Sequence, residues 1–149
     1  MKLIIMRHGE ASWASATDFD RPLTERGQQE VAKTADALLK KLAIDQVLAS
    51  PYLRAQQTGQ VVTERFNCPL TTLKSLTPDG QPQKVIEQLP EQGTILLASH
   101  MPMVGRLTGL LCDGVTHSGP EFCTAQAIIL NMEFPAAGLA SVLEWVNPE

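Results

Sequence analysis

The sequence predicts an α/β fold, a three-layer α/β/α sandwich around a mostly parallel sheet. Short apolar runs alternate with helical patterns along most of the chain, which is typical of parallel strands joined by helices. Two further apolar stretches near the C-terminus, with Pro135 and Gly138 between them, indicate a closing antiparallel hairpin. The sequence of 149 residues contains no internal repeat, so we expect a single domain over residues 1–149.

The first predicted strand is the apolar run from Leu3 to Met6, which ends at Arg7, His8 and Gly9. The run is too short for a lone helix, and its pair of isoleucines suits a strand that is buried on both faces. We expect Gly9 to free the backbone for a sharp turn. Arg7 and His8 then lie at the carboxyl end of a buried strand, where open α/β sheets bind their ligands.

Residues 10–22 are rich in Ser, Ala and Asp and show no period, which predicts a loop that packs through Trp13 and Phe19 at the mouth of the site. Trp13 either touches substrate or anchors this loop by its indole. A helix follows, with Thr24 as its N-cap. Apolar residues at helical spacing give this helix one buried face: Val31, Ala35, Leu38, Leu39 and Leu42.

The remaining elements are separated by turn residues. They are a strand at 46–49, a helix opened by Ser50-Pro51 that runs to about Phe66, a strand at 70–73, a turn at 77–80, a short helix at 83–89, a strand at 94–98, a helix that Pro102 starts, and hairpin strands at 125–132 and 139–145. Two further side chains have simple interpretations, since His117 lies in a predicted exposed loop and Trp145 alternates on a terminal strand that packs on the core.

Charge and cysteine content exclude several classes of protein. A net charge of −4 argues against an electrostatic nucleic-acid binder. Cys68, Cys112 and Cys123 are widely spaced, which indicates buried thiols in a reducing compartment and neither a zinc site nor a disulfide framework. The sequence lacks a signal-peptide pattern and any apolar segment of membrane-spanning length. We therefore expect a soluble, cytoplasmic protein that binds no membrane and needs no metal or cofactor.

Three predicted strands end in residues of the same chemical character. The first is followed by Arg7 and His8, the second by the segment that carries Arg54, and the fourth by His100. Because the carboxyl ends of parallel strands share one edge of a sheet, two arginines and two histidines converge there. The predicted helix N-termini add backbone N–H groups. Such a pocket suits a phosphoryl dianion.

The motifs at these positions resemble those of a known family. They are Arg7-His8-Gly9, Arg21-Pro22-Leu23-Thr24 with Gly27, Ser50-Pro51 with Arg54-Ala55 and Gln57-Thr58, and Ser99-His100. Together they resemble the histidine phosphatase superfamily, with its phosphoglycerate-mutase-like fold, over essentially the whole chain. The short length, the Arg-Pro-Leu-Thr run and the Leu76-Thr77-Pro78 turn are most similar to SixA-type phosphohistidine phosphatases.

The resemblance implies that His8 is the nucleophile and forms a transient phosphohistidine. It also implies that Arg7, Arg54 and His100 bind the phosphoryl oxygens, with His100 cationic when phosphate is bound. These roles agree with chemistry, because phosphoryl transfer needs in-line positioning and neutralisation of the equatorial oxygens. The position of Arg21 approaches the phosphate in this family, but Arg21 could equally be a structural residue of the loop.

An expected acid is missing from the sequence. Family members that cleave alcohol phosphates usually carry an acidic residue after the third strand, and related SixA-type chains often have Glu where this chain has Ser75. Asp79 is a possible general acid, although a turn Asp is more often structural, and Glu10 and Asp18 are weaker candidates. The imidazole of a phosphohistidine departs as a neutral group once its own nitrogen is protonated. The missing acidic residue therefore favours that substrate over a sugar phosphate.

The sequence therefore predicts an enzyme, a protein phosphohistidine phosphatase that acts on signalling or phosphotransfer proteins such as a histidine-phosphotransfer domain. One alternative is a small-molecule phosphomonoesterase or mutase of the same superfamily. Another is a non-catalytic module that binds phosphoproteins, although the presence of both His8 and His100 argues against it. The short segment 74–93 predicts an uncovered pocket that admits a side chain of another protein, unless the loop at 10–20 closes as a lid.

Overall fold

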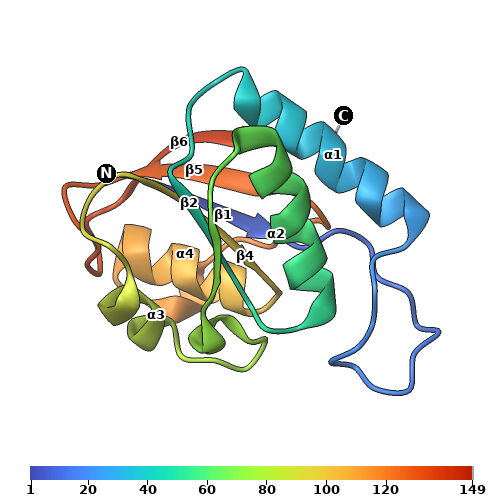
Figure 1. Cartoon of the computed structure of the whole chain (residues 1–149). Helices are drawn as coiled ribbons and strands as arrows, with labels where there is room; N and C mark the ends of the chain where they lie inside the picture. The colour runs from blue at the N-terminus through green and yellow to red at the C-terminus, as the bar shows by residue number, and fades with distance from the viewer. Residues whose placement is uncertain (149) are drawn as a thin grey trace.

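Six strands form one mixed sheet in the computed structural model, which describes residues 1–148 (Figure 1). The strands are β1 (Lys2–Arg7), β2 (Gln46–Ala49), β3 (Leu70–Thr72), β4 (Thr94–Ser99), β5 (Ala127–Asn131) and β6 (Ser141–Val146). Their order across the sheet is β3-β2-β4-β1-β5-β6. The first four are mutually parallel, whereas β5 is antiparallel to both β1 and β6. The predicted parallel sheet with a closing hairpin is confirmed.

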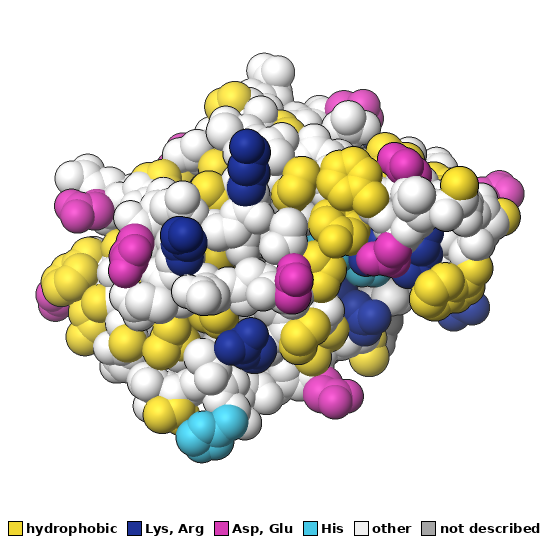
Figure 2. All heavy atoms as spheres, turned by 90° about the horizontal axis from the view of Figure 1, so that it is seen from below, with side chains coloured by type: hydrophobic (Ala, Val, Ile, Leu, Met, Phe, Trp, Pro, Cys, Tyr) yellow, Lys and Arg dark blue, Asp and Glu magenta, His cyan; other side chains and the backbone are white. Residues whose placement is uncertain are grey.

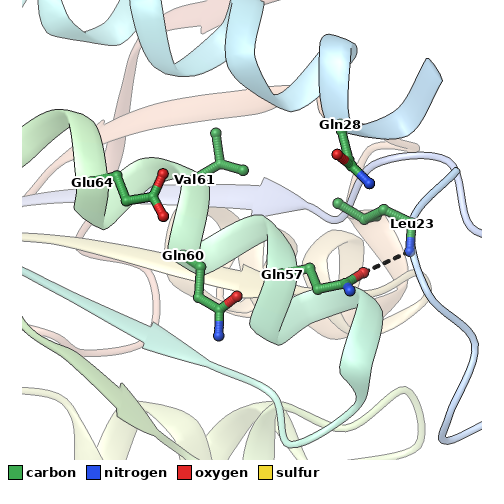
Figure 3. Close-up of a pocket in the computed structure, with 6 residues that line it drawn as sticks. All are labelled: Leu23, Gln28, Gln57, Gln60, Val61 and Glu64. Carbon is green, nitrogen blue, oxygen red and sulfur yellow. Dashed lines mark hydrogen bonds between the residues drawn. The ribbon is translucent and has the colours of Figure 1, made fainter. Parts of the chain in front are cut away.

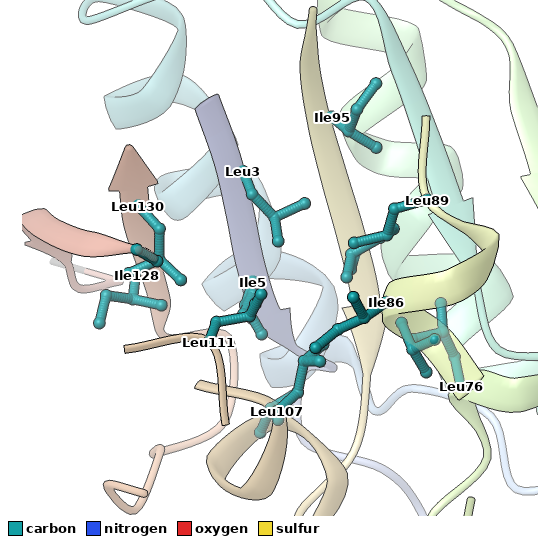
Figure 4. Packing of buried hydrophobic residues seen from close by; sticks show 14 of the residues in the cluster. Leu3, Ile5, Leu76, Ile86, Leu89, Ile95, Leu107, Leu111, Ile128 and Leu130 are labelled. Carbon is teal, nitrogen blue, oxygen red and sulfur yellow. The ribbon is translucent and has the colours of Figure 1, made fainter. Parts of the chain in front are cut away.

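Helices cover both faces of this sheet (Figure 1). They are α1 (Glu25–Leu39), α2 (Leu53–Phe66), α3 (Pro82–Gln88) and α4 (Met103–Asp113), with short 3-10 turns η1 (Lys74–Leu76) and η2 (Thr116–Ser118). One apolar cluster joins the sheet to α3 and α4 (Figure 4), and a second joins its other face to α1 and α2. The three-layer prediction is therefore confirmed. None of the helices in the described part of the chain is long and apolar enough to cross a lipid bilayer.

β1 runs through the middle of the molecule. Leu3 and Ile5 point into the cluster beneath α4, while Ile4 and Met6 point into the cluster beneath α1, and all four are fully buried. Burying a side chain of this size contributes about 1.5–3 kcal/mol. A strand with both faces anchored in this way is a rigid support for whatever follows it.

The register of the sheet aligns the carboxyl ends of β1, β2 and β4. Arg7 in β1 pairs with Ser99 in β4, and Ala49 in β2 pairs with Ala98. Three parallel strands therefore stop at the same level, and the chain leaves each of them at the same edge of the sheet. The prediction that these strand ends share an edge is confirmed.

Several local predictions need correction. Thr24 does cap α1, where its hydroxyl accepts a hydrogen bond of 2.9 Å from the amide of Gly27. Leu39, however, is 48% exposed, and Leu42 lies beyond the helix end. The second helix begins at Leu53, because Tyr52 still has extended backbone angles. Similarly, α4 begins one residue after Pro102, which serves as its N-cap.

Gly9 is required for a different reason from the one predicted. Its backbone does not adopt the left-handed conformation, in contrast to Gly93, Gly114 and Gly138. A Cβ atom on Gly9 would instead lie 2.6 Å from the carbonyl oxygen of Gly27 at the start of α1. The glycine thus permits α1 to approach the end of β1, and a side chain there would push the two elements apart.

Candidate active site

The aligned ends of β1, β2 and β4 open into a hollow of about 390 Å³. It is lined by Arg7, His8, Glu10, Ala11, Trp13, Asp18, Arg21, Arg54, Pro78, His100, Met101 and Thr124. Figure 2 shows a recess in which histidine and arginine or lysine side chains meet, with acidic and hydrophobic side chains at its rim. The structure therefore brings together all four strand-end residues that the sequence predicted, whereas His117 lies in η2 and is exposed.

His8 is held firmly at the base of this hollow and is 7% exposed. Its backbone amide donates to the carbonyl of Ser99 at 2.9 Å, and its carbonyl accepts from the amide of Ala125 at 3.0 Å. Its ring Nδ1 lies 2.7 Å from the Gly9 carbonyl, which only accepts, so Nδ1 carries the proton. The lone pair is then on Nε2, where it accepts a hydrogen bond of 3.3 Å from Nε of Arg54.

Burial is the main reason that the pKa of His8 is lowered, to about 4. The hydrogen bond to the Gly9 carbonyl opposes this shift, whereas the positive charges of Arg54 and Arg7 add to it. His8 is consequently neutral at pH 7, as a nucleophile must be.

The lowered pKa predicts a titration of His8 well below the ordinary range of histidine. The imidazole takes up its proton only as the pH falls towards about 4, so the nucleophilic form persists throughout the range from pH 7 to pH 5. Ring C–H resonances followed by NMR between pH 8 and pH 4 check this, with the spectrum of His8→Ala providing the assignment. A His8 titration centred near pH 6.5 would contradict the prediction.

Two arginines face His8 from different elements. Arg54 lies in the first turn of α2 and is 5% exposed. Its Nη1 donates to the backbone carbonyl of Asp18 at 2.7 Å. Arg7 donates from Nη1 to the carbonyl of Phe122 at 2.8 Å, and its buried Nε has no hydrogen-bond partner within residues 1–148. A buried donor without a partner is costly, and a phosphoryl oxygen would satisfy it.

His100 completes the group and is 1% exposed. Its ring lies edge-on to that of His8, with centroids 5.1 Å apart. Its Nε2 lies 2.7 Å from the hydroxyl of Ser50, which also accepts a hydrogen bond of 3.3 Å from the amide of Tyr52. When the Ser50 hydroxyl donates to Nε2, the proton of the neutral ring is on Nδ1. That buried Nδ1 has no partner in the described part of the chain, and in this tautomer it is a second donor suited to a phosphoryl oxygen.

The charge state of His100 depends on what binds beside it. Burial lowers the pKa of His100 to about 2, and the proximity of His8, Arg54 and Arg7 contributes. The neutral ring therefore prevails at pH 7. The cationic form implied by the family resemblance would need the negative charge of a bound phosphoryl group to stabilise it.

The sequence left two roles open for Arg21, binding the phosphate and holding the loop, and its position in the structure is compatible with both. It lines the hollow, but its Nε donates to the carbonyl of Ser12 at 2.9 Å and its Nη2 to that of Ala11 at 3.3 Å. Its guanidinium lies 3.5 Å from the ring centroid of Trp13. These contacts hold the loop in shape. Trp13 itself is 81% exposed, so its indole does not pack on the core and anchors the loop only through this contact with Arg21.

The acidic candidates are placed differently from one another. Asp79 is exposed and does not line the hollow, although its neighbour Pro78 does. Glu10 and Asp18 do line it. Partial burial raises the pKa of Asp18, but hydrogen bonds from Arg21 and Arg54 outweigh this effect and lower it overall. A carboxyl group that gives up its proton so readily is a poor general acid at neutral pH.

Sequence reasoning missed the role of Ser50. This residue directly follows β2, so the rule that drew attention to Arg7 and His100, a polar side chain at the end of a buried strand, applies equally to it. Its hydroxyl is fully buried against His100, a pairing of residues fifty positions apart that no local pattern reveals.

A second hollow, of about 270 Å³, lies between α1 and α2 (Figure 3). Its lining consists of Leu23, Gln28, Gln57, Gln60, Val61 and Glu64. The side-chain oxygen of Gln57 already has a partner, because it accepts a hydrogen bond of 2.7 Å from the amide of Leu23. The lining holds neither a cation nor an imidazole, so it does not suit a phosphate. Within residues 1–148 no group of three or more His, Cys, Asp or Glu side chains is arranged to hold a metal ion.

Comparisons with known proteins agree on one family. Residues 3–78 match the model of the histidine phosphatase superfamily (branch 1). The chain is 40% identical over 136 residues to phosphohistidine phosphatase SixA of Escherichia coli K12, which covers 86% of this chain and 83% of that protein. It is 33% identical over 126 residues to a SixA homolog of Haemophilus influenzae, covering 74% and 77% of the two chains. A solved structure of the protein histidine phosphatase SixA with tungstate matches with a TM-score of 0.86 and 34% identity, over 99% of this chain and 97% of that one.

Proposed function

The chain belongs to the histidine phosphatase superfamily, and we propose that it is a phosphohistidine phosphatase in which His8 carries the phosphoryl group during hydrolysis. The observation that carries this proposal is the orientation of His8. Its Nδ1–H is held by the Gly9 carbonyl, and its Nε2 lone pair faces a hollow lined by two arginines. A neutral imidazole held in this way needs no base to attack phosphorus, and the long hydrogen bond of 3.3 Å that Nε2 accepts from Arg54 gives way as the phosphoryl group enters.

In the first step, Nε2 of His8 attacks the phosphorus atom in line with the scissile bond. The new P–N bond forms as the P–N bond of the substrate breaks, and the substrate imidazole leaves with the electron pair of that bond. Arg54, Arg7 and the Nδ1–H of His100 are placed to bind the equatorial oxygens, where negative charge accumulates. In the second step, water attacks the same phosphorus as the P–N bond to His8 breaks. The electron pair of that bond returns to Nε2, the protons of the water leave with inorganic phosphate, and neutral His8 is restored.

The position of the acidic residues favours phosphohistidine as substrate. An alcohol is a poor leaving group without a proton donor. The imidazole of a phosphohistidine, in contrast, leaves as a neutral group when its other ring nitrogen is protonated. Asp79 lies outside the hollow, and the lowered pKa of Asp18 makes that residue an anion. Glu10 lines the hollow, but its carboxylate accepts a hydrogen bond of 2.9 Å from the hydroxyl of Thr24 and lies 4.0 Å from Nε of Arg26. The site is therefore better suited to a substrate that brings its own proton.

The rim of the hollow supports a protein-borne substrate. Trp13 and Phe19 are 81% and 46% exposed, and Phe19 packs on Tyr52 with ring centroids 5.0 Å apart. Exposed aromatic side chains around a cationic hollow are typical of protein-binding surfaces. We infer that the partner is a phosphohistidine-bearing protein, such as a histidine-phosphotransfer domain, whose surface rests on this rim.

The expected result is a far higher kcat/KM on phosphohistidine in a folded protein than on free phosphohistidine, because contacts beyond the phosphate add binding energy. Steady-state kinetics on both substrates, with a panel of sugar phosphates, measure it. Trp13→Ala should lower kcat/KM on the folded phosphoprotein more than kcat/KM on free phosphohistidine. Asp79→Asn should change neither kcat/KM by more than about twofold, the ordinary effect of an exposed substitution. Comparable values for the two substrates would contradict recognition by the rim, and faster hydrolysis of a sugar phosphate would favour a phosphomonoesterase.

We also propose that the protein works in the cytoplasm, where thiols stay reduced. Cys68, Cys112 and Cys123 are all free, but the prediction that they are buried is wrong, because Cys68 and Cys112 are only partly buried and Cys123 is exposed. Burial raises the pKa of the Cys68 and Cys112 thiols, so these two remain protonated and unreactive at neutral pH.

A further inference from the structure

The side chain of Asp18 bridges two arginines of the candidate active site. Its Oδ1 lies 3.2 Å from Nη1 of Arg21, and its Oδ2 lies 3.4 Å from Nη2 of Arg54. Its backbone carbonyl also accepts the shorter hydrogen bond of 2.7 Å from Nη1 of Arg54. One residue of the loop thus contacts Arg54 through two independent groups, and only one of these groups is charged.

The carboxylate contacts the part of Arg54 that would bind a phosphoryl group. The guanidinium of arginine binds oxyanions through a pair of parallel N–H groups. In Arg54, Nε points to Nε2 of His8 and Nη2 points to the Asp18 carboxylate. A phosphoryl group attached to His8 would place its oxygens against the same guanidinium, so Asp18 and the phosphoryl oxygens compete for it.

Two properties allow the carboxylate to yield this position. The Asp18 side chain is 58% exposed, so it can rotate into water. Its departure would leave Arg54 held by the backbone carbonyl, because that hydrogen bond does not involve the side chain. Arg54 therefore stays in place whichever anion it faces.

We propose that the Asp18 carboxylate competes with phosphate for Arg54 and Arg21, and thereby weakens the binding of inorganic phosphate so that the product leaves. This inference rests on the proposed phosphatase function and adds to it a residue that sets the affinity of the site. A hollow with two arginines beside a nucleophile binds a phosphate dianion well, and tight binding of product slows turnover. A competing carboxylate offsets that attraction without removing either arginine.

Isothermal titration calorimetry of inorganic phosphate with purified wild type, Asp18→Asn and Asp18→Ala tests the proposal. Both substitutions keep the backbone carbonyl, and we expect the Kd of phosphate to fall by about tenfold, the effect of one charge removed from beside a bound anion. Phosphate should inhibit phosphohistidine hydrolysis more strongly by the same factor. Asp20→Asn is the matched control, because it removes one charge from the same loop, where Asp20 pairs with Thr17 and with neither arginine. Its Kd should stay within about twofold of wild type.

The sign of the change separates the possible outcomes. If Asp18 instead served to position Arg54, its replacement would weaken phosphate binding, and a Kd that is unchanged or higher in both variants overturns the proposal. An equal fall in Asp20→Asn would overturn it too, since general loop charge would then explain the effect. Failure of wild type and of both variants to bind phosphate would overturn this inference and leave the proposed function standing, provided that wild type hydrolyses phosphohistidine. Failure of wild type to hydrolyse phosphohistidine would overturn the proposed function.

Discussion

Replacing His8 by alanine is expected to lower kcat on phosphohistidine by at least about a thousandfold, because the variant lacks the atom that receives the phosphoryl group. The fold should survive, since the side chain packs at the edge of the sheet and the apolar residues of β1 are untouched. Circular dichroism and thermal unfolding check the fold, and rapid-quench kinetics check the rate.

A trapping experiment separates nucleophilic catalysis from other roles of His8. Wild type quenched in alkali during turnover should retain phosphate that is labile to acid, and mass spectrometry should place it on His8. His117→Ala serves as the control, because this exposed histidine lies in η2, away from the hollow. Substantial turnover by a well-folded His8→Ala protein, or trapped phosphate on another residue, would exclude the covalent mechanism.

Replacing Arg54 by alanine is expected to cost about 3 kcal/mol or more of transition-state stabilisation, a loss of at least about a hundredfold in kcat/KM. The guanidinium is buried, contacts Nε2 of His8 directly and is oriented by the Asp18 carbonyl, so it is preorganised before the phosphoryl group arrives. Preorganised charge in a buried site stabilises a transition state far more than the same charge in water.

Arg54→Lys should recover only part of this loss, because an ammonium group cannot present two parallel N–H donors. Arg65→Ala is the matched control on the same helix, since Arg65 pairs with Asp36 on the surface. Kinetics of the three variants on one phosphohistidine substrate show whether catalysis needs the paired N–H donors of Arg54 or only its positive charge. Equal rates for Arg54→Lys and wild type would mean that only charge matters.

Much of the fold and of the candidate site could be predicted from local sequence patterns. The apolar run of β1 and the alternation of strands with helices predicted the layers, because burial of apolar surface on both faces of a strand leaves few other architectures. Arg7, His8, Arg54 and His100 were predicted as one site, because each follows a parallel strand and such ends share an edge. The errors were local as well, and they include the first residues of α2 and α4, the reason for Gly9, and the exposure of Leu39 and Trp13.

The sequence by itself thus determined which residues meet at the edge of the sheet, since residue type and position after a strand are both readable from the chain. The tertiary structure alone decided how they act. The tautomer of His8 depends on the Gly9 carbonyl and the guanidinium of Arg54, the proton of His100 depends on Ser50, and the contact of Asp18 with Arg54 depends on how the loop folds back. Hydrogen bonds and pKa values respond to distances of a few ångströms between residues far apart in the chain, and no spacing along the chain encodes such distances.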